Sequence, residues 1–198
     1  MWRTLPLFGA LLIAGCSGEW DAPLPPPWQR AVETGSALAQ ASGDGLSRRA
    51  HLDARVLVIS RRDYSERLDD PLSRFSPIDL AVAWGGAATR AGRSDFSVRQ
   101  PWRRYSWSYG RPVRKGSGMP SVVRDFMVST ANWHIVPASA AVRMDMDRIG
   151  RGDVVSMSGF LVDVDLGHGR RARTSLRRDD QGDGACEIFL VEEMRIES

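Results

Sequence analysis

The chain has 198 residues, which is enough for one domain of ordinary size with a hydrophobic core. Hydrophobic residues make up 42% of the chain and charged residues 26%, which excludes a chain that is disordered throughout. The 27 basic and 24 acidic residues leave a formal net charge of only +3, so the charge does not require a nucleic-acid partner, and we expect none.

The first residues have the pattern of an exported protein. Arg3 precedes an apolar run over residues 5–15, which is too short for a spanning helix of about 20 residues but fits the apolar core of a signal peptide. The run ends in the segment Leu12-Ile13-Ala14-Gly15-Cys16, which resembles the lipobox of bacterial lipoproteins. An ordinary signal peptide with a chance cysteine is the alternative.

The resemblance to bacterial lipoproteins implies a lipid anchor. Residues 1–15 would be removed as a lipoprotein signal peptide, and the thiol of Cys16 would take a diacylglyceryl group, with acyl chains such as palmitate. Two or more acyl chains hold a protein stably at a membrane. Ser17, in a place where Asp often signals retention in the inner membrane, favours the outer membrane facing the periplasm.

Residues 16–50 are predicted to form a tether between the anchor and the folded domain. Three consecutive prolines in residues 19–27 favour a semi-rigid polyproline II spacer, and a short helix could follow in residues 28–41. Residues 51–198 are then expected to form a single globular β-rich domain.

The first half of this domain contains one clear strand. Residues 52–60 are rich in β-branched and apolar side chains, which predicts a strand, and the polar residues 61–76 predict a loop. Ser76 and Pro77 look like a helix start, with Asp79 three residues after the cap. Because the apolar run that follows is short, a strand is equally consistent with it.

The middle of the domain contains a segment in which aromatic and polar side chains alternate. In residues 94–110, Tyr105, Trp107 and Tyr109 share one face, which predicts a strand with an aromatic ladder. Residues 120–130 are consistent with a helix or a strand. Residues 138–149 predict a short helix with Ser139 as its cap.

The last part predicts three strands. Residues 154–165 form the first, and Gly159 within it suggests a bulge or sharp bend. After a turn, residues 170–176 supply a partner strand, and residues 187–196 close the domain. The expected class is mainly β with minor α, as a small OB-like β-barrel. A mixed α+β sheet is the alternative.

Four stretches together resemble a group of uncharacterised bacterial envelope proteins. They are Leu80–Gly85, the run Asn132-Trp133-His134 with its neighbours in residues 131–137, the Gly152–Gly159 stretch, and the loop of residues 178–187. The resemblance spans roughly residues 52–193. It implies a single domain and supplies no catalytic residue.

Cys186 raises a catalytic hypothesis. Once Cys16 is lipidated, the chain has no second thiol for a disulfide, because it contains two cysteines. Cys186 could then be a nucleophile with His134 as base and Asn132 or an Asp as orienting group. Alternation places Asn132 and His134 on one side of a strand. The competing interpretation is a buried, inert thiol at the start of a core strand, with a structural histidine.

A metal site and a cofactor are not expected. Asp179 and Asp183 occupy positions 1 and 5 of an EF-hand-like loop, but position 12 is Leu190 where a bidentate Glu is needed. A tight Gly-rich turn is the preferred interpretation, with weak calcium binding through these two carboxylates as the alternative. No glycine loop that could cradle phosphate is present, so we expect no cofactor.

The segment Arg99–Lys115 is basic and aromatic. Trp102, Arg103, Arg104 and Trp107 form its candidate contact surface for an anionic polymer of the envelope, such as a glycan, or for a protein partner. The preferred interpretation of the segment itself is an edge strand whose arginines prevent further pairing and whose aromatic rings fill the core.

Two functional hypotheses follow from these observations. The favoured one is a lipid-anchored protein of the cell envelope that acts as a binding or structural module, because the motifs present favour such a module over an enzyme. The other is an envelope hydrolase or thiol enzyme that uses His134 and Cys186.

Overall fold

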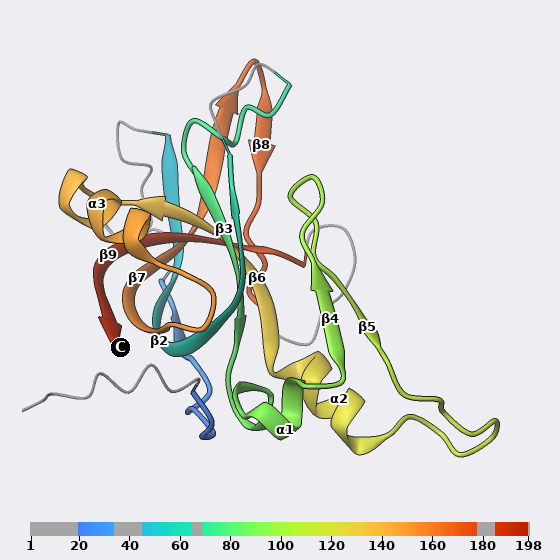
Figure 1. Cartoon of the computed structure of the whole chain (residues 1–198). Helices are drawn as coiled ribbons and strands as arrows, with labels where there is room; N and C mark the ends of the chain where they lie inside the picture. Colours follow the sequence, from blue (N-terminus) through green and yellow to red (C-terminus); the bar gives the residue numbers. More distant parts are fainter. Residues whose placement is uncertain (1–19, 34–44, 65–68, 178–184, 198) are drawn as a thin grey trace, which may run out of the picture.

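The computed structural model describes residues 20–33, 45–64, 69–177 and 185–197. These residues form a large β-sheet, a small hairpin and short helices (Figure 1). The strands are β1 (Trp28–Ala31), β2 (Leu46–Asp63), β3 (Ile78–Ala83), β4 (Phe96–Arg99), β5 (Ser106–Tyr109), β6 (Thr130–Pro137), β7 (Val154–Gly167), β8 (Arg170–Ala172) and β9 (Glu187–Glu197). The helices are η1 (Gly86–Ala88), α1 (Arg90–Arg93), α2 (Ser121–Val128) and α3 (Ala140–Arg148).

The large sheet has the strand order β1-β2-β3-β6-β9-β7-β8, and β2 also pairs with β7. Strand β2 is long enough to pair with both β7 and β3. Its residues 46–57 pair with β7, and its residues 57–63 pair with β3. The pairings therefore run through β3, β6, β9 and β7 and return to β2. All of them are antiparallel except the parallel pair β6–β9.

The predicted class, mainly β with minor α, is confirmed. The ring of pairings and the position of α3 between β6 and β7 give the connectivity of the OB-like arrangement expected from the sequence. The whole is a mixed sheet and not a clear closed barrel, and β1 and β8 extend the sheet at its two edges. The mixed sheet, which is the predicted alternative, therefore describes the molecule.

The main core lies on one face of the strands, and a smaller apolar cluster lies on the other. In β6, Trp133 and Ile135 belong to the main core, whereas Val136 belongs to the smaller cluster. This alternation, which the sequence predicts, places Asn132 and His134 on the opposite side of β6 from Trp133. Two polar side chains are thereby held together within an otherwise apolar sheet.

Part of the predicted tether belongs to the folded domain. Strand β1 pairs with β2, and Leu24 is buried and forms an isolated bridge with Gly85, whose N–H donates to the Leu24 carbonyl at 2.8 Å. Strand β2 also begins at Leu46, within the segment 16–50. The predicted domain start at residue 51 is therefore too late for these residues, because burial of the apolar Leu24 side chain and strand pairing attach the extended segment to the domain.

Two segments left open by the sequence are now assigned. Residues 78–83 form β3 and not a helix, although Ser76 and Pro77 resemble a helix start. All six residues of β3 are buried between β2 and β6, so hydrogen bonding to both neighbours decides its conformation. Residues 121–128 form α2. The predicted α3 is confirmed, and the Ser139 hydroxyl accepts from the Val142 N–H at 3.2 Å.

The predicted bulge in β7 is also confirmed. The register between β7 and β9 shifts between Ser158 and Gly159. Gly159 has φ +157°, and a Cβ atom there would lie 2.0 Å from the carbonyl oxygen of Leu190. Only glycine lets the two strands approach so closely at this point.

The β4–β5 hairpin forms a separate two-stranded sheet, which lies on the side of the molecule away from α3 in Figure 1. Phe96 stacks on Phe126 of α2 with ring centroids 3.8 Å apart, and Trp107 meets the same ring edge-on. The hairpin is thus attached to the domain through aromatic packing. None of the helices in the described ranges is long and apolar enough to cross a membrane.

Candidate functional site

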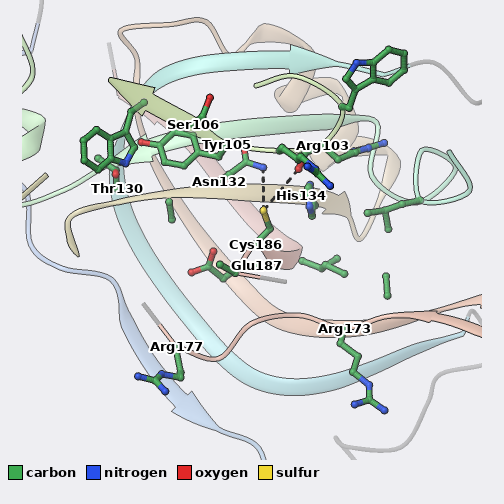
Figure 2. A pocket seen from close by; sticks show the side chains of 18 of the residues that line it. Arg103, Tyr105, Ser106, Thr130, Asn132, His134, Arg173, Arg177, Cys186 and Glu187 are labelled. Atoms are coloured by element: carbon green, nitrogen blue, oxygen red, sulfur yellow. Dashed lines mark hydrogen bonds between the residues drawn. The ribbon is translucent and has the colours of Figure 1, made fainter. Parts of the chain in front are cut away.

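A cleft of about 680 Å³ opens between the turn that precedes β5 and the start of β9 (Figure 2). Segments that are distant in sequence meet at its walls. The lining residues are Leu72, Trp102, Arg103, Arg104, Tyr105, Ser106, Trp107, Met127, Thr130, Ala131, Asn132, His134, Ala172, Arg173, Arg177, Ala185, Cys186, Glu187 and Ile188.

Cys186 reaches the cleft because it stands just before β9. In the parallel pair β6–β9, Trp133 lies opposite Glu187, which brings the preceding residues Asn132 and Cys186 together. The Ser175 N–H donates to the Cys186 carbonyl at 3.1 Å and fixes the backbone there. The thiol is half-buried and lines the cleft, so the expected burial of Cys186 is only partial.

His134 is held by Asp79 across two strands. The two residues are direct cross-strand partners in the pair β3–β6, and Nδ1 of His134 lies 2.8 Å from Oδ1 of Asp79. Both side chains are buried, with exposed fractions of 6% and 0%. The predicted same-side arrangement of Asn132 and His134 is therefore confirmed, and it places His134 against a carboxylate.

The pKa of His134 reflects opposing effects. Burial disfavours the charged imidazolium and by itself lowers the pKa. Hydrogen bonds with Asp79 and with Cys186, together with the charges of these groups, outweigh burial and raise the pKa from 6.5 to about 9. The imidazole is therefore cationic at neutral pH, between a carboxylate on one side and a sulfur on the other.

Arg103 secures this carboxylate from the opposite side. Its guanidinium donates to Oδ1 of Asp79 at 2.8 Å, to Asp70 at 2.8 Å and to the carbonyl of Ser76 at 2.8 Å. It also lies over the ring of Tyr64, 3.7 Å from the centroid. Asp79 thus accepts from two cations, which compensates the cost of burying its charge.

Asn132 is oriented toward the thiol in a similar way. Gln100 Nε2 donates to Oδ1 of Asn132 at 2.7 Å, and this fixes which end of the amide faces the cleft. The Nδ2 group of Asn132 then donates to Sγ of Cys186 at 3.7 Å. Two pairs of side chains therefore meet at the sulfur of Cys186. In one pair Asp79 holds His134, and in the other Gln100 holds Asn132.

All four predicted contact residues line the cleft, but they differ in what they do. Trp102 is 79% exposed and Arg104 is also exposed, as expected of a contact surface. Trp107 is half-buried against Phe126 and supports the hairpin. Arg103 needs a correction, because its side chain is only 14% exposed and its charge is engaged by Asp70 and Asp79.

Trp102 and Arg103 also have unusual backbone conformations. Their φ values are +50° and +65°, in the left-handed region that side chains other than glycine rarely adopt. The turn is closed by the Arg104 N–H, which donates to the Pro101 carbonyl at 2.9 Å, while the Arg103 N–H donates to the Tyr64 hydroxyl at 3.0 Å. These bonds and the ion pairs of Arg103 hold the turn so that Trp102 projects outward beside the cleft.

Arg173 and Arg177 complete the basic part of the lining. Figure 2 shows their side chains directed away from Cys186, toward the outside of the cleft. Positive charge is therefore concentrated at the rim, while the floor holds a sulfur, an amide and a cationic imidazole that already faces a carboxylate.

Sequence reasoning missed Asp79 and Gln100. Asp79 had a signal, because it is a carboxylate in the apolar run of residues 78–83, and a charge buried in a central strand must have partners. We interpreted it as part of a helix start. Gln100 follows β4 in a loop, and nothing in its neighbourhood marks it as the partner of Asn132.

Three predicted residues lie outside the described part of the chain. They are the lipidation candidate Cys16 and the calcium candidates Asp179 and Asp183. Within the described ranges no group of three or more His, Cys, Asp or Glu side chains is arranged to hold a metal ion.

The chain was compared with protein-family models, with curated proteins and with solved structures, and none of the three comparisons found a match. The function of the cleft therefore has to be argued from its residues.

Proposed function

We propose that this is a lipid-anchored protein of the cell envelope whose cleft binds an anionic envelope polymer. The observation that carries the proposal is the convergence of arginine and aromatic side chains from distant segments at the rim of one cleft. The anchor is inferred from the lipobox-like segment that ends at Cys16, and the orientation toward the periplasm from Ser17.

The charges at the cleft favour an anionic ligand. Four of its described lining residues are arginines, and Glu187 is the one acidic residue among them. Arg103 is engaged by Asp70 and Asp79, while Arg104, Arg173 and Arg177 are exposed residues of the lining. Guanidinium groups bind carboxylates and phosphates through two parallel hydrogen bonds, so the rim suits a chain that carries such groups.

The placement of these charges favours a polymer over a small anion. Figure 2 shows Arg173 and Arg177 directed away from Cys186, and Trp102, whose ring is exposed, lines the same cleft. A small anion bound next to Cys186 could not contact the rim arginines and the Trp102 indole at the same time. An extended chain lying across the opening can contact the arginines with its charges and the indole with an apolar ring face.

The binding proposal is tested with fluorescein-labelled polygalacturonate as a polyanion probe and neutral dextran as its control. The double variant Trp102→Ala, Arg173→Gln is expected to bind the polyanion about tenfold more weakly, because it removes one stacking ring and one cation. Arg151→Gln, which removes an exposed arginine away from the cleft, is the matched control and should bind like the wild type. Equal binding of dextran and the polyanion, or an unchanged affinity of the double variant, would contradict the proposal.

The anchor is tested separately. Cells that produce the full chain are labelled with a fatty-acid probe, and the wild type is compared with Cys16→Ala. We expect label on the wild type alone, and we expect crosslinking to place it next to envelope components. A wild-type protein without label would reject the lipid anchor and leave the binding proposal standing.

A further inference from the structure

The floor of the cleft contains a grouping that polymer binding does not need. The sulfur of Cys186 faces the cleft, and Asn132 and His134 lie next to it (Figure 2). Each of these two side chains is itself fixed by a buried partner, Gln100 in one case and Asp79 in the other. A thiol that only filled space would require neither of these two fixed side chains beside it.

The charges around His134 place an imidazolium cation beside the thiol of Cys186, whose S–H donates to the Arg103 carbonyl at 3.9 Å. The groups that face the imidazole and its carboxylate are Asp79 from β3, Cys186 before β9, Arg103 from the turn and Tyr64 after β2. Arg103 and His134 share the Asp79 carboxylate. The raised pKa of His134 keeps its imidazole protonated at neutral pH. An imidazolium next to a thiol stabilises the thiolate, which is the nucleophilic form of cysteine.

We propose that Cys186 is a nucleophile that accepts acyl groups from carboxylic esters in this cleft, with His134 as acid and base and Asn132 as donor to the carbonyl oxygen. The inference rests on the cleft being open to ligands, as the proposed function also requires, but not on the charge of the ligand.

The reaction balances without any further reactant except water. The thiolate of Cys186 attacks the ester carbonyl carbon, a C–S bond forms, and the C–O bond to the alcohol breaks. The His134 imidazolium gives its proton to the departing alkoxide. Water then attacks the thioester while neutral His134 takes a proton from it, the C–S bond breaks, and the carboxylic acid leaves. The thiolate and the imidazolium are restored.

Asn132 has a defined part in this reaction. Its Nδ2 group points at Sγ from 3.7 Å, so the oxygen of an acyl carbon attached to the sulfur comes within reach of the same donor. A donor aimed at that oxygen stabilises the negative charge that develops on it in the transition state. Gln100 and Asp79 are positioning residues, because each acts through the side chain that it holds.

The first experiment measures the state of the thiol. The full chain with Cys16→Ser has Cys186 as its one thiol, and it is alkylated with iodoacetamide from about pH 5 to about pH 9, folded and unfolded in urea. The unfolded rate should fall about tenfold for each pH unit on the acid side. At about pH 6 the folded chain should react about tenfold or more faster than the unfolded chain.

Variants assign this behaviour to His134. His134→Asn should lose this advantage and react about tenfold or more slowly than the parent chain at about pH 6. His168→Asn, which changes an exposed turn histidine, should react like the parent chain. Folded and unfolded curves that coincide would overturn the proposal. This comparison needs no variant and stays decisive if His134→Asn does not fold.

The second experiment tests acyl transfer. With p-nitrophenyl acetate the folded parent chain should release a burst of nitrophenolate equal to the amount of protein, and mass spectrometry should find one acetyl group on Cys186. Cys186→Ala should show no burst. Asn132→Ala should slow acetylation about a hundredfold and slow alkylation far less, since alkylation creates no oxyanion. A reactive thiol without an acetyl group would overturn the acyl-transfer proposal.

The two proposals fail in distinguishable ways. Loss of polygalacturonate binding with an intact burst would refute the polymer ligand alone. Normal polygalacturonate binding by a chain whose Cys186 behaves as an ordinary thiol would refute the nucleophile alone.

Discussion

At the scale of single residues, the site depends on charges that are buried together. Asp79 is fully buried in β3, and two cations, from Arg103 and His134, meet at one of its oxygens. The coupling of these groups means that a change at one of them alters the stability of the fold as well as the chemistry at Cys186. Two predictions follow at this scale.

The stability of the protein should depend on pH through His134. Its pKa in the folded state, about 9, lies above the ordinary value of 6.5, so protonation favours the folded state. This contribution is complete below about pH 6.5 and is lost as the pH rises through about 9. The free energy of unfolding should fall by roughly 3 kcal/mol over that range, as measured by urea denaturation.

The variant His134→Asn serves as the control for this pH effect and should show a much smaller decrease. Cys186→Ala should retain most of the decrease, because the hydrogen bond with Asp79 raises the pKa of His134 more than the one with Cys186 does. A wild-type stability that stays constant across this range would contradict the assignment.

Replacing Arg103 should destabilise the fold, whereas replacing the adjacent Arg104 should change the stability little. Arg103→Met leaves Asp79 buried with one cation fewer and leaves Asp70 without this partner, at a cost of about 3–5 kcal/mol. Arg104→Met, in the adjacent exposed position, should cost less than about 1 kcal/mol. Thermal or urea unfolding of both variants gives the comparison. Equal losses of stability in the two variants would show that the ion pairs of Arg103 do not contribute to the free energy of unfolding.

At the scale of elements, the site is built by three adjacent strands. Strand β3 supplies Asp79, β6 supplies Asn132 and His134, and the start of β9 places Cys186. The parallel pairing of β6 with β9 determines the position of Cys186, and β9 is in turn aligned by its long antiparallel pairing with β7. The register of β7 against β9, which Gly159 adjusts, therefore influences the geometry at the thiol.

Substitution of Gly159 should test this dependence. Gly159→Ala would place a methyl group 2.0 Å from the Leu190 carbonyl oxygen in a backbone conformation that alanine avoids. The strands must shift to accommodate it, so we expect a destabilisation of about 1–3 kcal/mol and slower alkylation of Cys186. Gly86→Ala is the control, since a Cβ atom there meets nothing within 4 Å. An unchanged melting temperature of Gly159→Ala would disprove the close approach.

At the scale of the whole molecule, the segment before β2 closes the end of the fold. Leu24 is buried against Gly85 near η1, and β1 adds an edge to the sheet beside the first half of β2. If the anchor exists at Cys16, only a few residues separate it from this ordered segment. The domain would then lie close to the membrane surface and not at the end of a long tether.

Leu24 provides the test of this closure. Leu24→Ala removes a buried side chain and should lower the free energy of unfolding by about 2–5 kcal/mol. Val113→Ala, at a half-exposed position, should change it by less than about 0.5 kcal/mol. Urea denaturation of the full chain compares them. Equal stability of both variants would mean that residues 20–33 do not contribute to the core.

Local patterns in the sequence determined much of the secondary structure. Alternation along β6 and β7, the Ser139 cap of α3 and the Gly159 bulge could each be predicted, because each depends on neighbours within a few residues. The mainly-β class followed from the same patterns. Local patterns were misleading at residues 76–79, where a good helix start is overridden by pairing on both sides of β3.

Only the tertiary structure decided how the site is assembled. The sequence named Cys186, His134 and Asn132 but had no means of bringing them together, since more than fifty residues separate the thiol from the other two. Asp79 and Gln100 were not found at all. Their roles depend on strand order and register, which arise when the strands of the whole sheet bury their apolar faces together, and no short stretch of sequence contains that information.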